Sequence, residues 1–159
     1  MHAKSSALRI IFAAGLIAGV LDIGYVLVVY GLWRGANSVK ILQGIAAALI
    51  GREAAANGGF ATAALGLGVH FAVALSVTAV FYALSRKISF LVEQPLIAGP
   101  LFGIAVWLVM QLVVLPLTAT PPKSFPPPQW WVVFIAHVVC VGLPIALVVR
   151  RMERRVVTA

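Results

Sequence analysis

Four polar side chains capable of acid–base chemistry or hydrogen bonding lie inside long apolar runs of this chain. They are Asp22, His70, Gln111 and His137. Ionisable groups are rare inside membrane helices, where they usually face a polar partner or a water-filled cavity. A carboxyl and two imidazoles can exchange protons, hold a polar ligand or hydrogen-bond to one another. Which of these the four side chains do depends on whether the fold brings them to the same depth in the membrane.

The composition is that of a membrane protein. Hydrophobic residues make up 62% of the 159 residues and charged residues 10%, whereas soluble domains carry about 25% charged residues. The net charge of +8 comes from basic residues between and after apolar runs, a pattern that indicates membrane topology and argues against a nucleic-acid partner. The single cysteine, Cys140, excludes an internal disulfide and is predicted to pack in an apolar run.

Four apolar runs are long enough to cross a bilayer, which takes about 20 helical residues. The first is too long for a signal-peptide core of about 7–15 residues and ends in aromatics, so we expect a retained span. The sequence predicts one all-α membrane domain over residues 1–159, with four transmembrane helices in an up-down bundle. The proline-rich stretch before the last run predicts a stiff connector. The expected spans are approximately 7–33, 61–85, 95–118 and 130–149.

A shorter helix is expected at approximately 38–50, between the first two spans. Its apolar residues recur at helical spacing, and polar or small residues interrupt the other side, which predicts an amphipathic helix at the membrane interface. The apolar positions are Val39, Leu42, Ile45, Ala46 and Leu49, and the interrupting positions are Lys40, Gln43 and Gly44.

Two pairs of glycines have the spacing that lets membrane helices approach closely. Gly15 and Gly19 lie in the first span, and Gly99 and Gly103 lie in the third. Because small residues four apart share one helix face, both pairs are predicted helix-packing sites.

The distribution of basic residues predicts that both termini are cytoplasmic, because positive charges are enriched on that side of bacterial membranes. The last four arginines are also candidates for contact with lipid headgroups. The predicted inside charges are Lys4, Arg9, Arg86, Lys87, Arg150, Arg151, Arg154 and Arg155, and the outside charges are Arg34, Lys40, Arg52 and Lys123.

Counting from the outer end of each run places the four polar residues at similar depths. At 1.5 Å per residue, Asp22 lies about 16 Å deep, His70 about 14 Å, and Gln111 and His137 about 10 Å each. The second and fourth spans are diagonal in an up-down bundle, so the two histidines are expected to point toward each other.

Three interpretations of this polar centre remain open. Asp22 and the histidines could hydrogen-bond to one another and only fix the helix register. His70 and His137 could instead ligate a haem b iron, with Gly66 and Ala74 leaving room for the ring. They could also relay protons or bind another small ligand. No nucleophile or acid pair forms a catalytic constellation, so an enzyme is not predicted, and no other metal site is expected.

Four short motifs lie within the expected spans: Gly-Leu-Ile-Ala-Gly-Val at 15–20, Gly-Val-His-Phe around His70, Pro-Leu-Thr at 116–118 and Ala-His-Val around His137. Together they resemble the YagU-like group of small four-span bacterial inner membrane proteins. The resemblance covers most of the chain and implies a multi-pass protein of the bacterial inner membrane, without implying a reaction or ligand.

The functional prediction is an inner-membrane protein whose Asp/His/His centre binds a small ligand or relays protons. The alternative is an accessory subunit that packs against a larger membrane complex through its glycine pairs. The expected partners are the lipid bilayer and possible further copies or subunits.

Overall fold

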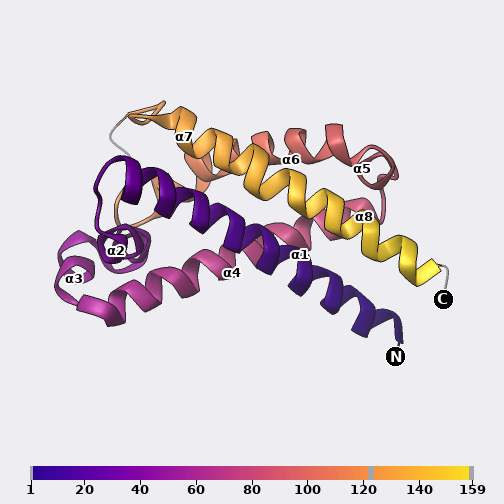
Figure 1. Ribbon diagram of the computed structural model, residues 1–159, viewed down its shortest axis with the longest axis horizontal. Helices are drawn as coiled ribbons and strands as arrows, with labels where there is room; N and C mark the ends of the chain where they lie inside the picture. Colours follow the sequence, from indigo (N-terminus) through magenta and orange to yellow (C-terminus); the bar gives the residue numbers. More distant parts are fainter. Residues whose placement is uncertain (1, 122–123, 158–159) are drawn as a thin grey trace.

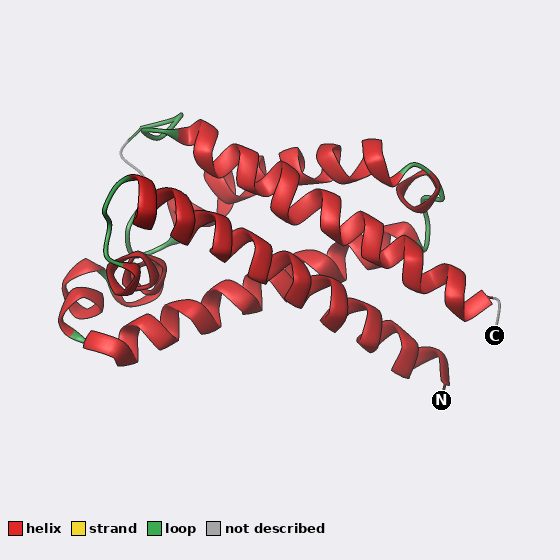
Figure 2. Cartoon of the chain, viewed as in Figure 1, coloured by secondary structure: helices red, strands yellow, loops and turns green. Residues whose placement is uncertain are grey.

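The computed structural model describes residues 2–121 and 124–157, with side chains from 6 to 121 and from 124 to 154. Lys123 and the side chains of Lys4 and Arg155, which entered the charge prediction, lie outside the described residues. Helices form all the regular structure in the described ranges (Figure 2). In chain order they are α1 (His2–Val26), η1 (Leu27–Trp33), α2 (Ser38–Ile50), α3 (Arg52–Asn57), α4 (Gly59–Ser85), α5 (Phe90–Glu93), α6 (Pro95–Val109), η2 (Met110–Val114), η3 (Leu115–Leu117), α7 (Trp130–Ile135), η4 (Ala136–Gly142) and α8 (Leu143–Val157).

Four helical stretches of the described chain are long and apolar enough to cross a membrane, which confirms the predicted fold class. They contain between 23 and 28 residues, against about 20 needed to span the hydrocarbon. The last helix is longer than predicted, because it continues through the arginine cluster to Val157. These stretches indicate a multi-pass membrane protein. Their bounds are Ser6–Trp33, Gly59–Ser85, Pro95–Leu117 and Trp130–Arg154.

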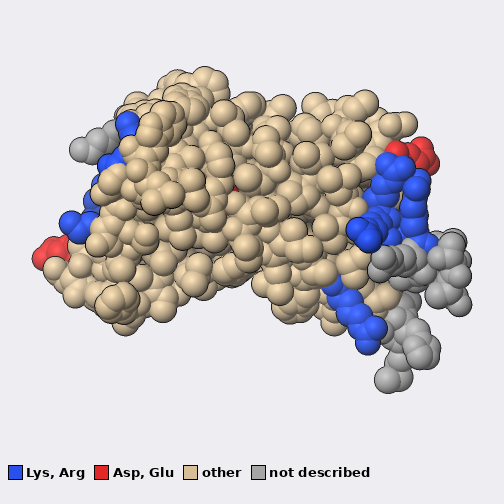
Figure 3. All heavy atoms as spheres, in the orientation of Figure 1, with Lys and Arg blue, Asp and Glu red and all other residues tan. Residues whose placement is uncertain are grey.

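The two ends of the molecule carry its exposed charge. Both termini lie at the same end (Figure 1), where Arg86 after α4 forms an ion pair with Glu153 of α8 at 3.7 Å. On the face shown in Figure 3, lysines and arginines gather at the two ends, and a broad band between them is almost free of charged side chains. This is the distribution expected when the band lies in lipid.

The first and fourth spans form the centre of the bundle. α1 packs against α4 on one side and against η4 and α8 on the other, and α6 packs against the fourth span. α4 and α6 meet through Phe81 and Phe102, whose ring centroids lie 4.9 Å apart in an edge-to-face contact. The largest cluster of buried apolar residues joins α1, α4 and the fourth span, and consists of Ile10, Ala14, Ala18, Phe81, Val141, Ile145, Ala146 and Val149.

Helix α2 has the predicted bounds and lies across the direction of the spans (Figure 1). The Asn37 side chain caps its start by accepting a hydrogen bond from the Val39 amide at 2.8 Å. The predicted polar face is wrong in one respect, since Gln43 is buried. Its Nε2 donates to the Gly59 carbonyl at 3.0 Å and to Thr62 Oγ1 at 3.3 Å. Gln43 is turned inward because the start of α4 offers it acceptors.

Gly66 brings the backbone of α2 against α4. A Cβ at this position would overlap the Leu42 carbonyl oxygen and lie 3.1 Å from the Ala46 nitrogen. We therefore expect Gly66→Ala to push α2 off α4 at a cost of roughly 1–3 kcal/mol. Hydrogen exchange measured by mass spectrometry should show faster exchange over 42–50. Gly44→Ala is the control, because a Cβ there meets nothing within 4 Å, and wild-type protection in Gly66→Ala would contradict this packing.

Three of the spans contain π-helical stretches toward the end opposite the termini. These are η1, η2 and η4. Pro116 follows η2 closely and Pro144 follows η4. Proline has no N–H to donate to the carbonyl four residues earlier, and this loss loosens the preceding turn. Gln111 and His137 both lie in these stretches, a helical form that recurs at functional sites.

Candidate polar centre

Asp22 on α1 and His70 on α4 form the core of the centre. The Asp22 Oδ2 atom lies 3.9 Å from His70 Nδ1, and their side chains are 15% and 13% exposed. The other ring nitrogen, Nε2, lies 2.9 Å from the Gly19 carbonyl oxygen on α1. The close approach of α1 and α4 positions the pair, because Gly19 meets the Phe71 ring and Ala74 where a side chain would otherwise lie.

These contacts fix where the histidine protons lie. A carbonyl oxygen only accepts hydrogen bonds, so His70 Nε2 carries the hydrogen that it shares with Gly19. The remaining nitrogen, Nδ1, faces the Asp22 carboxyl. Either the carboxyl is protonated and faces a bare nitrogen, or the imidazolium faces a carboxylate. At 3.9 Å the Nδ1 and Oδ2 atoms are within ion-pair distance but too far apart for a direct hydrogen bond.

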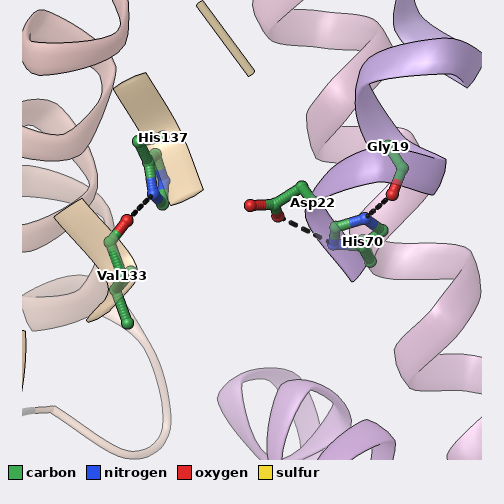
Figure 4. A network of polar contacts seen from close by, with 5 residues as sticks. All are labelled: Gly19, Asp22, His70, Val133 and His137. Atoms are coloured by element: carbon green, nitrogen blue, oxygen red, sulfur yellow. Dashed lines mark hydrogen bonds and ion pairs between the residues drawn. The ribbon is translucent and has the colours of Figure 1, made fainter. Parts of the chain in front are cut away.

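Asp22 lies between the two histidines rather than beside them (Figure 4). One carboxyl oxygen is turned toward His70, and the other, Oδ1, is turned toward the side where His137 lies. Oδ1 is buried and has no hydrogen-bond partner among the described residues. The expectation that His70 and His137 point directly at each other is therefore wrong, because α1 passes between their helices and presents Asp22 there.

His137 is held by its own helix. Its Nδ1 lies 2.8 Å from the Val133 carbonyl oxygen, so Nδ1 carries the donated hydrogen and neutral His137 has a lone pair on Nε2. His137 lies on the side of Asp22 away from His70 (Figure 4). Asp22 Oδ1 and, in the neutral ring, His137 Nε2 are both hydrogen-bond acceptors, and Oδ1 has no donor among the described residues. A proton or a donor molecule such as water would complement both.

Sequence reasoning missed two neighbours of this centre. Cys140 and Tyr25 each lie about one helical turn from a residue of the centre. The signal in the sequence was their spacing, since Tyr25 follows Asp22 by three residues and Cys140 follows His137 by three. Cys140 is half-buried and pairs with no other cysteine.

Gln111 does not lie at the same depth in the bundle as the polar centre. Gly103 packs against the His137 backbone, and Trp107, one turn later, contacts the Phe134 ring at a centroid distance of 5.4 Å. Gln111 is eight residues after Gly103, so at 1.5 Å per residue it lies about 12 Å from the level of His137. Its side chain is buried and its Oε1 has no partner among the described residues.

The error in the predicted depth of Gln111 has a simple cause. Counting from the end of each apolar run assumes that all runs end in one plane. The third span instead continues through η2 and η3 to Leu117, beyond the residues that pack against the start of the fourth span. Trp107 contacts Trp130, the first residue of α7, at a centroid distance of 5.8 Å.

The residues around His70 do not fit a bis-histidine haem. The face of Gly66, expected to leave room for the ring, is filled by the α2 backbone at Leu42. Ala74 is buried against Gly19 of α1. In addition, Asp22 lies between the two imidazoles. No group of three or more His, Cys, Asp or Glu side chains suited to a metal occurs in the described part of the chain.

Both glycine pairs make contacts within the chain. A Cβ at Gly15 would lie 2.8 Å from Leu75 Cδ2, and Gly19 packs against the same helix. A Cβ at Gly99 would lie 2.8 Å from Leu143 Cα, and Gly103 meets the fourth span at His137. These faces are therefore not available to a larger complex, as the accessory-subunit prediction required. The headgroup prediction for Arg150, Arg151 and Arg154 stays a prediction; the first is half-buried and the other two are exposed.

Comparison of the chain with protein families, with curated proteins and with solved structures found no match. The class that its own structure defines is a multi-pass helical membrane protein with an Asp–His pair inside the bundle.

Proposed function

We propose that this protein binds and relays protons through Asp22, His70 and His137. The observation that carries the proposal is the buried, unpartnered Asp22 Oδ1, which is turned toward His137 while Oδ2 faces His70. Leaving a buried polar atom without a hydrogen bond costs about 1–3 kcal/mol. A proton or a protonated water at this position would remove the cost.

The arrangement supports a balanced proton transfer. A proton on His137 Nε2 passes through a bridging water to Asp22 Oδ1. The proton held at Oδ2 passes to His70 Nδ1 when the 3.9 Å gap between these atoms closes to hydrogen-bond distance or is bridged by a water. His137 becomes neutral, Asp22 keeps one proton and His70 becomes an imidazolium, so one positive charge moves across α1 without a net change in the three groups.

The test is proton uptake into liposomes that contain the purified protein, driven by a potassium diffusion potential and followed with an internal pH-sensitive dye. We expect the wild type to conduct above protein-free liposomes and Asp22→Asn to fall to their level, because asparagine has a similar shape but no exchangeable acidic proton. Asp22→Glu should retain part of the flux.

The matched control is Glu53→Gln, which removes an exposed carboxylate from α3 and should leave the flux unchanged. Wild-type flux equal to that of protein-free liposomes, or equal flux in Asp22→Asn and the wild type, would overturn the proposal. Because Asp22→Asn could also alter folding, its helix content and thermal unfolding are measured on the same preparation.

We further propose that the protein resides in a bacterial inner membrane with both termini in the cytoplasm, as a member of the YagU-like group. The short motifs of the sequence and the two-to-one bias of basic residues support this placement. In this orientation α2 lies on the periplasmic side.

A further inference from the structure

A second feature, independent of the polar centre, lies at the end of the molecule opposite the termini. A cavity of about 340 Å³ opens between the end of the first span and the start of the fourth. Aromatic and aliphatic side chains form its walls, and one cation and one amide provide its polar groups. The lining residues are Val29, Trp33, Arg34, Gln129, Trp131 and Val132.

Arg34 is held in place at this cavity. One guanidinium nitrogen donates a hydrogen bond to Gln129 Oε1, and the guanidinium carbon lies 5.9 Å from the centroid of the Tyr30 ring. Gln129 has a φ of 60°, in the left-handed region, which strains the backbone of a non-glycine residue. The chain thus accepts backbone strain at the residue that orients the arginine.

The charge of Arg34 is not balanced within the described structure. Its contacts are the neutral Gln129 and Tyr30, and no carboxylate of the described residues lies within ion-pair distance. A guanidinium has five N–H donors in a planar fork, so several remain for an anion. Two N–H groups in this geometry match a phosphate particularly well.

The position of the cavity indicates which kind of molecule supplies the phosphate. Tryptophans at the ends of membrane spans lie at the level of the lipid headgroups, and Trp33 and Trp131 are both exposed there. We infer that this cavity binds the phosphate headgroup of an anionic phospholipid from the adjacent leaflet. Arg34 pairs with the phosphate, and the valines and tryptophans contact the glycerol and the start of an acyl chain.

The experiment is native mass spectrometry of the purified protein with added phosphatidylglycerol or phosphatidylcholine. We expect the wild type to retain one phosphatidylglycerol preferentially and Arg34→Gln to bind it about tenfold more weakly, because the ion pair with the phosphate is lost. Arg52→Gln is the matched control, since it removes an exposed arginine of α3 that does not line the cavity. Its lipid binding should equal that of the wild type.

Equal retention of the two lipids by the wild type, or equal binding by Arg34→Gln and the wild type, would overturn the inference. Displacement of the lipid by inorganic phosphate would also overturn it, because the site would then take the free anion. If Arg34→Gln fails to fold, the inference is tested on the wild type by the quenching of its tryptophan fluorescence. Stronger quenching by brominated phosphatidylglycerol than by brominated phosphatidylcholine supports the inference, and equal quenching contradicts it.

Discussion

Replacing Gly142 by alanine is expected to lower the free energy of unfolding by roughly 2–3 kcal/mol, because the added methyl group has no space. A Cβ at Gly142 would overlap the Gly99 carbonyl oxygen and lie 2.6 Å from the Gly103 nitrogen and 2.8 Å from its Cα. All three atoms belong to the α6 backbone, which cannot move aside as a flexible side chain would. The third and fourth spans would have to separate.

The measurement is thermal or denaturant unfolding in detergent, followed by tryptophan fluorescence. Gly68→Ala in α4 and Gly24→Ala in α1 are matched controls, since a Cβ at either position meets nothing within 4 Å. Both should be neutral or stabilising by up to about 1 kcal/mol, because alanine favours the helix more than glycine does. If Gly142→Ala unfolds like these controls, the close packing of the third and fourth spans is wrong.

The elements of this fold could be predicted from the sequence because lipid imposes simple constraints. Each span must satisfy its backbone internally and present apolar side chains, so runs of apolar residues mark the helices almost directly. The 38–50 helix could be predicted because its apolar residues repeat at helical spacing. Neither signal shows which helices touch, because lipid and protein interiors favour the same side chains.

The failures all concern which side chains face one another. Gln43 looked like a surface residue, yet the start of α4 supplies acceptors that only the folded chain provides. Gly66 looked like open space beside His70, but a distant helix fills it. Asp22 and His70 were correctly expected at one depth, since both were counted from ends of adjacent helices, whereas Gln111 lies in a span that extends further outward.

The second prediction concerns the stability of Asp22 and His70 variants. It distinguishes a functional role of this pair from a purely structural one. We expect His70→Leu to destabilise the protein by roughly 2–3 kcal/mol, because it leaves a buried carboxyl without a partner on either oxygen. Asp22→Leu should cost less, since neutral His70 keeps its hydrogen bond to Gly19. The double variant should recover most of the loss from His70→Leu, because no buried carboxyl remains.

Denaturant unfolding of the wild type, both single variants and the double variant gives the coupling energy between Asp22 and His70, expected to be about 1 kcal/mol or more. Asp22→Leu combined with Gln111→Leu is the control pair, and these changes should add within about 0.5 kcal/mol because the two residues lie at different levels. If Asp22→Leu is instead as costly as His70→Leu and the double variant is worse than either, the pair stabilises the bundle.

The difference in cost between Asp22→Leu and His70→Leu is informative, because removing either partner of a purely structural contact should destabilise the fold. A buried carboxyl that can be replaced by leucine at little cost is not required for packing, as is common for ionisable groups inside proteins. If its removal also abolishes proton uptake, Asp22 is present for its acidic proton. The unpartnered Oδ1 atom then marks where a proton is exchanged with the side of His137, and Oδ2 marks where one is exchanged with His70. The hydrogen bonds of His70 to Gly19 and of His137 to Val133 keep the two imidazoles oriented for the exchange.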